Sequence, residues 1–200
     1  MEDRPAMIEF IRKHSFGLMF STHEGGPWAT HMPFIFEESA DGSDMLLGHM
    51  ARANPQWKDI DAQRVLVVFQ GPHAYISPSW YFEKNQVPTW NYMAVHATGI
   101  TTVLNEQQTG EVVGRMLKFY QTDAAMTGLL GDVPFKGMLR ATVGIRVAVE
   151  RLEGAAKLNQ NKSAESRKNV AERLLRSDDA VARQLGSAMT AEIARRVSEQ

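Results

Sequence analysis

Short strand-like segments separated by turn signals run through most of this chain, and their spacing restricts the folds that it can adopt. The segments lie at residues 16–22, 28–36, 45–49, 64–70, 74–77, 91–104 and 141–152. In the last of them Val143, Ile145 and Val147 alternate with small or charged residues, which is the period of a strand with one buried face. Short antiparallel strands of this kind favour a small barrel with helices around it.

Helical patterns flank these strands, at 5–14, 106–120, 163–176 and 178–199, and Asn54 can cap a short helix at 55–60. Gly71-Pro72 predicts a turn, Gly186 predicts a bend or break in the last helix, and residues 128–137 predict a loop. We therefore expect a mainly β fold with flanking helices (α+β), built on a Greek-key antiparallel barrel. The barrel domain is expected over 1–160, and a helical extension that packs on the barrel or on a dimer partner is expected over 161–200.

Length, charge and cysteine content limit the class of protein. A chain of 200 residues suits one domain with an appendage. The net charge of −1 excludes a polyelectrolyte binder, although residues 151–200 carry ten Lys and Arg against seven Asp and Glu. The absence of Cys excludes disulfides and cysteine zinc sites. Because no apolar run resembles a signal core or a membrane span, we expect a cytoplasmic protein with no membrane partner.

Polar aromatic residues gather between Gly48 and Tyr92, where three of the four Trp and three of the four Tyr lie. A pocket that stacks a flat ligand uses such side chains, and so does a dimer interface. Packing of a loop against itself explains them equally well. The composition of this window therefore marks a candidate binding region and leaves its occupant open.

Two positions in or near this window have the chemistry of a phosphate or ring contact. Arg52 follows a strand end and precedes Asn54-Pro55, so its guanidinium can fork onto a phosphate beside a helix N-terminus. A surface ion pair with Asp59 or Asp61 is the simpler interpretation. Pro33 removes a ladder donor from the segment that contains His31 and Met32, which predicts a strand edge or bulge. Free backbone groups at an edge can hydrogen-bond a heteroaromatic ring.

Three other patterns carry weaker signals. His31, His49, His73 and His96 fall in or beside strands, but none is paired at i, i+4, so we expect core or pocket histidines and no metal site. The polar run 157–163 can reach a ligand phosphate through Lys157 and its amides, or is a solvated linker. The junction at Ser177-Asp178 has the order of a helix-turn-helix, but it lacks Gly and its acidic residues repel phosphate.

Five segments together resemble a known family. They are STHEGGPWATHMPF, LLGHMARANPQW, VLVVFQGPHAYISPSWY, VPTWNYMAVHATG and KLNQNKS, in this order. The pattern is similar to that of the PaiB-like proteins, which are described as FMN-binding negative transcriptional regulators. The resemblance extends from about residue 8 to about residue 167, and the last thirty or so residues match only as a generic helical tail.

The resemblance implies a bacterial split β-barrel, similar to the pyridoxamine phosphate oxidase group, that forms a homodimer with FMN in clefts at the subunit interface. It implies that His31 and Met32 meet the isoalloxazine ring. It also implies that Arg52 and Asn54 meet the phosphate and that Ala53, between them, belongs to the cofactor site. Four further residues complete the implied site, in part from the other subunit: Trp90, Lys157, Gln160 and Asn161. Transcriptional regulation, and with it DNA as a partner, follows from the family description alone.

Two features depart from that description. The chain shows no evident nucleic-acid domain, and it has no obvious acid/base pair, so we expect no catalytic side chain and leave any redox chemistry to the flavin. Two alternatives stay open. One is a flavin-dependent oxidoreductase acting on a small aromatic substrate stacked near Trp80 and Trp90, and the other is a haem-binding split-barrel protein.

Overall fold

The computed structural model describes residues 3–39, 42–120, 137 and 139–198. The strands are β1 (Phe16–His23), β2 (Gly26–Glu37), β3 (Met45–Ala51), β4 (Arg64–Ile76), β5 (Thr89–Val103) and β6 (Thr142–Lys157). The helices are α1 (Arg4–Lys13), α2 (Glu106–Tyr120), α4 (Ala164–Leu175) and α5 (Ala180–Ser198), with 3-10 turns η1 (Pro55–Lys58) and η2 (Pro78–Trp80). Among the described residues, no helix is long and apolar enough to span a membrane.

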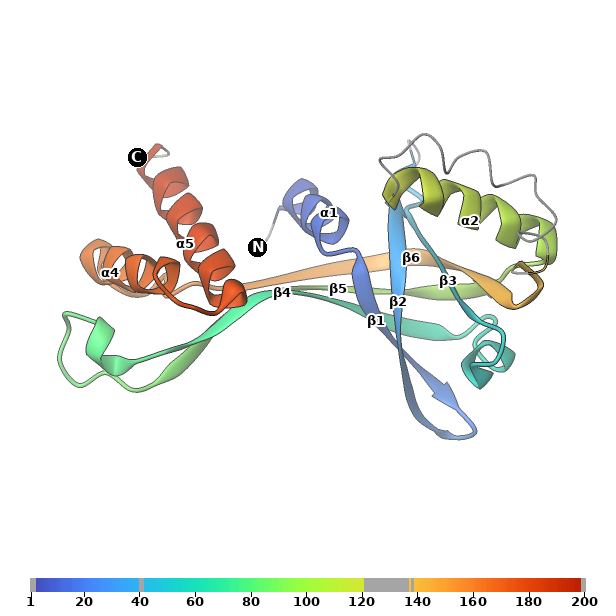
Figure 1. Cartoon of the computed structure of the whole chain (residues 1–200), viewed down its shortest axis with the longest axis horizontal. Helices are drawn as coiled ribbons and strands as arrows, with labels where there is room; N and C mark the ends of the chain where they lie inside the picture. Colours follow the sequence, from blue (N-terminus) through green and yellow to red (C-terminus); the bar gives the residue numbers. More distant parts are fainter. Residues whose placement is uncertain (1–2, 40–41, 121–136, 138, 199–200) are drawn as a thin grey trace. The chain divides into compact units, whose positions relative to one another are not determined.

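The strands pair into a closed barrel in the order β1-β2-β3-β6-β5-β4 (Figure 1). β1 and β2 form a hairpin in which His23 lies opposite Gly26, and Glu24 and Gly25 turn the chain with φ of 49° and 78°. β3 pairs antiparallel with β2 on one side and with β6 on the other. Because β6 returns beside β3 across two intervening strands, the order is of the Greek-key kind. The predicted split-barrel fold with flanking helices is confirmed.

Buried apolar side chains fill the barrel. Phe34 and Phe69 are fully buried and their rings meet edge to face, with centroids 5.7 Å apart, an arrangement that adds to area burial. α2 lies along β2 and β3 (Figure 1). It covers a second apolar cluster formed by Ile35, Leu47, Leu104, Val112 and Met116.

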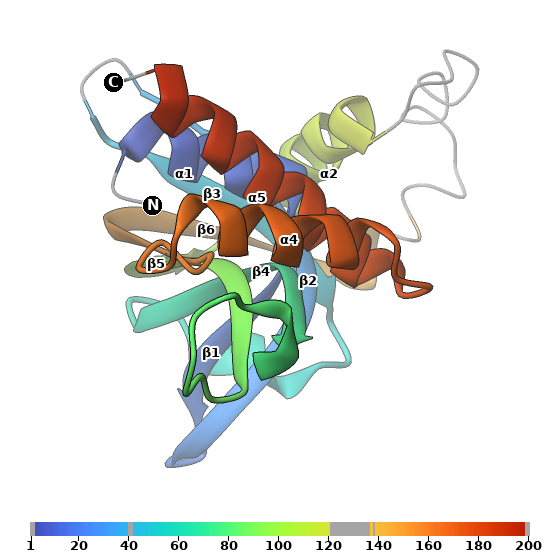
Figure 2. The same cartoon turned by 90° about the vertical axis from the view of Figure 1, so that its left-hand side faces the viewer.

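The chain divides into two compact units. The barrel unit comprises Glu2–Phe69 and Val95–Glu153, and the helical unit comprises Gln70–Ala94 and the residues from Gly154 onward. In the helical unit α4 and α5 pack side by side, and α4 also contacts η2 (Figure 2). Their shared core includes Ile76, Tyr81, Leu158, Val170, Leu174, Leu185 and Met189.

Two local predictions are wrong. Gly71-Pro72 does not form a turn, because β4 continues from Arg64 to Ile76. The alternation of buried residues shifts by one position there, since Gly71 and Pro72 are both buried, as happens at a bulge. Gly186 does not break α5, which runs from Ala180 to Ser198. A Cβ on Gly186 would lie 2.9 Å from the Leu175 nitrogen, so the glycine serves close helix packing.

The predicted loop at 128–137 lies, apart from residue 137, outside the described residues. The predicted division of the chain at residue 160 stays a prediction.

Candidate functional site

The candidate ring-binding edge belongs to β2. Gly26–Pro33 pair with β1, whereas the pairing of β2 with β3 covers Phe34–Glu37. Pro33, which has no N–H to donate, therefore stands where the second ladder begins. In the described part of the chain, the half of β2 before Phe34 is paired on one side, as expected for an edge.

His31 and Met32 differ in solvent exposure along this edge. The His31 side chain is exposed and its ring stacks 6.3 Å from that of Phe16. Met32 is only 1% exposed and packs against Gly48, where a Cβ would lie 2.8 Å from the Met32 Cε. Met32 is therefore buried as a whole residue, and of these two residues only His31 is open to a ligand.

Arg52 is exposed, and the structure gives it partners other than Asp59 or Asp61. Its Nε donates to the Arg140 carbonyl at 2.7 Å and its Nη2 donates to the Thr142 carbonyl at 3.1 Å. The guanidinium also lies 5.4 Å over the Trp57 ring. Because a guanidinium has further N–H groups, Arg52 can tie β3 to the start of β6 and still meet an anion.

Asn54 connects the Arg52 segment with the edge strand. Its Oδ1 accepts from the Gln56 nitrogen at 3.1 Å and caps η1, which confirms the predicted cap. Its Nδ2 donates to the Thr30 hydroxyl at 2.7 Å. Thr30 directly precedes His31, so the hydrogen bond places the two predicted halves of the site next to each other.

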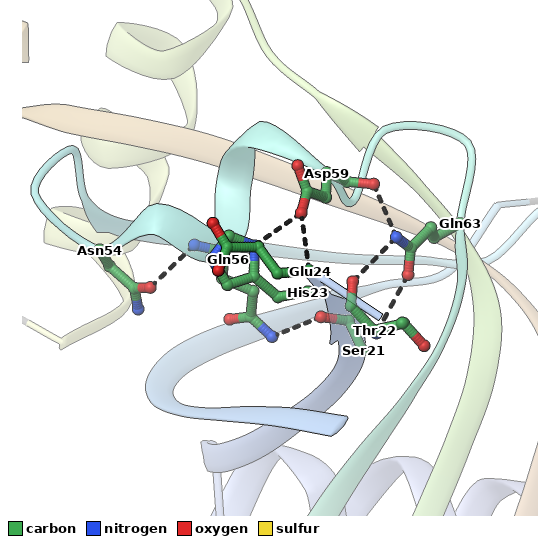
Figure 3. Close-up of polar contacts among 8 residues, drawn as sticks. All are labelled: Ser21, Thr22, His23, Glu24, Asn54, Gln56, Asp59 and Gln63. Atoms are coloured by element: carbon green, nitrogen blue, oxygen red, sulfur yellow. Dashed lines mark hydrogen bonds and ion pairs between the residues drawn. The ribbon is translucent and has the colours of Figure 1, made fainter. Parts of the chain in front are cut away.

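A network of polar contacts fixes the rest of this segment to the β1–β2 hairpin (Figure 3). Gln56 Nε2 donates to the Ser21 hydroxyl at 2.8 Å, and Asp59 Oδ2 lies 2.6 Å from His23 Nδ1. Asp59 also accepts from the backbone N–H of Glu24, and this bond, followed by His23, lowers the Asp59 pKa. The segment is therefore attached to the hairpin through three of its residues, which are Asn54, Gln56 and Asp59.

The other predicted site residues belong to the helical unit. Trp90 is 56% exposed and meets Tyr75 edge to face at 6.3 Å. Lys157 Nζ donates to the Thr89 hydroxyl. Gln160 is engaged within its own loop, since its Oε1 accepts from the Leu158 nitrogen at 2.8 Å, and Asn161 is exposed. His31, Met32, Arg52, Ala53 and Asn54 belong to the barrel unit, and these four residues belong to the helical unit.

Several polar residues that matter to these sites have no sequence signal of their own. Thr30 and Gln56 read as ordinary polar residues, yet Thr30 bonds Asn54 and Gln56 is fully buried. In the helical unit Tyr81, Asn159 and Arg167 are all buried. Of these three residues, Asn159 has the residue type that its backbone requires, because its φ of 60° is a conformation that Asn tolerates.

The histidines show no metal-like arrangement. Burial lowers the pKa of His49, whose Nδ1 lies 3.2 Å from the Met116 sulfur. Among the described residues, no three His, Asp or Glu side chains gather as a metal site would require. His49 is therefore best understood as a neutral side chain packed under α2.

The geometry suits a flat ligand that carries an anionic group. The barrel unit offers an edge of backbone groups beside Thr30 and an exposed guanidinium one short segment away. These groups fit a heteroaromatic ring and a phosphate.

Comparison with known proteins gives consistent results. A family model described as "Putative FMN-binding domain" matches residues 1–151. The protease synthase and sporulation protein PAI 2 of Bacillus subtilis is 38% identical over 184 residues, which cover 90% of this chain and 88% of that protein.

Solved structures share the fold at low sequence identity. The flavocytochrome Anf3 from Azotobacter vinelandii aligns with a TM-score of 0.56 at 12% identity, over 78% of this chain and 68% of that one. The FAD and heme binding protein from Mycobacterium smegmatis aligns with a TM-score of 0.57 at 12% identity, over 78% and 72%. At such identities the likeness extends to the fold alone.

Proposed function

The chain belongs to the PaiB-like family of FMN-binding split-barrel proteins, and on that premise we propose that it binds FMN at the β2 edge and acts as a negative transcriptional regulator. The hydrogen bond from Asn54 to Thr30 supports this proposal most directly. It joins a strand edge suited to a flavin ring to a segment suited to its phosphate. Bound FMN would supply hydride and electron transfer, while the protein binds and orients it.

Each predicted residue has a specific part in this proposal. The backbone at His31 hydrogen-bonds the isoalloxazine edge and the His31 side chain flanks it, while buried Met32 supports the strand from the core side. Arg52 donates to the phosphate with the N–H groups that Arg140 and Thr142 do not use. Ala53, which is exposed, allows the phosphate to approach the backbone before Asn54.

We extend the proposal to a homodimer in which Trp90, Lys157, Gln160 and Asn161 complete the flavin site of the partner copy. Trp90 would stack on the flavin, since it is a large exposed ring. Lys157 would add charge near the phosphate. The native mass of the purified protein, with and without FMN, tests this part.

FMN titration followed by flavin fluorescence tests the binding site. Arg52→Ala should weaken FMN binding by about 1.5–3 kcal/mol, the range of a hydrogen bond to a charged group. Arg64→Ala is a matched control, because Arg64 is also exposed and also makes two hydrogen bonds, both to Glu150. Equal FMN affinity in wild type and Arg52→Ala, or an equal loss in the control, would contradict the role of Arg52.

Regulation through DNA has its own test. Binding to a DNA fragment should weaken steeply as salt rises, because released counterions drive such binding. A flat response to salt, or no complex at low salt, would remove DNA from the proposal.

Rapid bleaching of the bound flavin by NAD(P)H would instead favour the alternative function, a flavin-dependent oxidoreductase.

A further inference from the structure

Arg167, in the first turn of α4, is a buried residue with two nitrogens that find no acceptor among the described residues. The residue is 8% exposed, and its Nε and Nη2 make no hydrogen bond within the described part of the chain. A buried charge that lacks a partner is costly. The nearby carboxylate of Glu83 does not serve it, because Glu83 accepts from the Ser163 nitrogen at 2.9 Å and the Ser166 hydroxyl at 2.6 Å.

The two unpartnered nitrogens form the side of the guanidinium that binds two oxygen atoms at once. Arg64 uses the same pair to hold Glu150, at 2.9 and 3.1 Å. Arg195 uses it to hold Glu192, at 3.0 and 3.2 Å. Within the described ranges, no carboxylate accepts from this two-donor side of Arg167, so its geometry suits an anion with paired oxygens.

The charges around Arg167 favour a doubly charged anion. Burial lowers the Arg167 pKa, repulsion from Arg196 adds to this, and Glu192 opposes it. Glu192 is already bound by both Arg195 and Arg196. Three arginines and one glutamate leave this cluster with a net charge of +2, which a phosphate group with a charge of about −1.5 to −2 would neutralise.

We propose that Arg167 is the receptor for a phosphate group, which it binds through Nε and Nη2 at the α4–α5 contact of the helical unit. Arg196 and Glu192 on α5 are close enough to Arg167 to influence its pKa, so they border the site. The proposal does not depend on FMN binding at the β2 edge, since every residue that carries it belongs to the helical unit.

A physical consequence distinguishes this site from a structural arginine. If the function of Arg167 is to bind a ligand, its buried charge lowers the stability of the ligand-free protein. Replacing a buried unpaired charge with an apolar side chain is often neutral or stabilising. Arg167→Met should therefore melt at the same temperature as wild type or higher in the absence of phosphate. A structural arginine would instead lower the melting temperature when removed.

Thermal unfolding in inorganic phosphate, compared with chloride at equal ionic strength, tests the proposal. Wild type should show a saturable rise in melting temperature with phosphate. Arg167→Met should weaken the phosphate affinity at least about tenfold. Arg173→Met, at an exposed arginine of the same helix, should respond as wild type does. Arg167→Lys serves as a second test should Arg167→Met fail to fold. It keeps the charge without the paired donors, so it should bind phosphate more weakly than wild type.

The absence of a phosphate-specific rise in wild type would overturn the proposal, as would an unchanged phosphate response in Arg167→Met or Arg167→Lys. Titration with riboflavin and FMN identifies the source of the phosphate group. A stronger effect of Arg167→Met on FMN than on riboflavin assigns the site to the flavin phosphate, and equal effects assign it to a free phosphate or another phosphoester. FMN binding that survives every Arg167 variant leaves the β2 site intact, so the two proposals can fail separately.

Discussion

The hydrogen bond between Asn54 and Thr30 can be isolated by a double-mutant cycle. Asn54→Ala removes both the cap on η1 and the donor to Thr30, whereas Thr30→Val removes only the hydroxyl that accepts from Asn54. The two changes share a single direct interaction, the 2.7 Å bond from Nδ2 to Oγ1. The cycle therefore measures what holds the Arg52 segment beside the β2 edge.

The expected magnitudes follow from the contacts that each change removes. Loss of a cap costs about 0.5–2 kcal/mol, and loss of a hydrogen bond costs about 0.5–1.5 kcal/mol. Asn54→Ala should therefore destabilise the protein by about 1–3.5 kcal/mol, and Thr30→Val by about 0.5–1.5 kcal/mol. The double variant should cost less than the sum by about 0.5–1.5 kcal/mol, because the shared bond is lost only once.

Urea unfolding followed by tryptophan fluorescence measures the four free energies. Asn105→Ala is the matched control, since Asn105 caps α2 by accepting from the Gln108 nitrogen at 2.9 Å and makes no bond to Thr30. Its effect should add to that of Thr30→Val. A coupling energy below about 0.3 kcal/mol between Asn54 and Thr30 would refute the reasoning that this bond joins the two parts of the site.

Two further changes test the barrel and the helical unit. Gly99→Ala should destabilise the protein by about 3 kcal/mol in urea unfolding, the upper end for overpacking, because the new Cβ would lie 2.1 Å from the Ala148 carbonyl oxygen. Gly110→Ala, whose Cβ would be 3.6 Å from Leu139, should be neutral or stabilising, and similar effects of the two changes would contradict this account. Hydrogen bonds, first from Ser166 and then from Ser163, lower the pKa of Glu83 from 4.5 to about 2. The stabilisation is thus complete above pH 4.5 and is lost as pH falls toward 2. Glu83→Gln should therefore flatten the decline in stability between these pH values, and an unchanged decline would exclude the contact.

Local features of the sequence predicted most of the fold. Alternating apolar residues located the strands, helical spacing located α1, α2, α4 and α5, and Asn54 caps η1 as expected. These signals work because period and capping depend on neighbours within one turn or a few residues. The five ordered segments also indicated the family, and with it the residues of the proposed flavin site.

The local rules failed where distant segments determine the outcome. Glycine is a helix-breaking residue type, yet Gly186 lies inside α5. A side chain at this position would collide with α4, so close packing of the two helices explains the glycine. Gly71-Pro72 has the composition of a turn, yet it lies inside β4, whose buried face shifts by one residue there. In both cases packing overrides the intrinsic preference of the residues.

The sequence by itself determined the strand and helix periods, the caps and the membership of an FMN-binding family. Tertiary structure decided that Met32 is a core residue and that Arg52 binds two carbonyl groups of the chain. It also decided that Arg167 is buried with two nitrogens that have no acceptor in the described part of the chain. The physical reason is that a residue's period depends on its neighbours in sequence, whereas its burial and its hydrogen-bond partners depend on segments far along the chain.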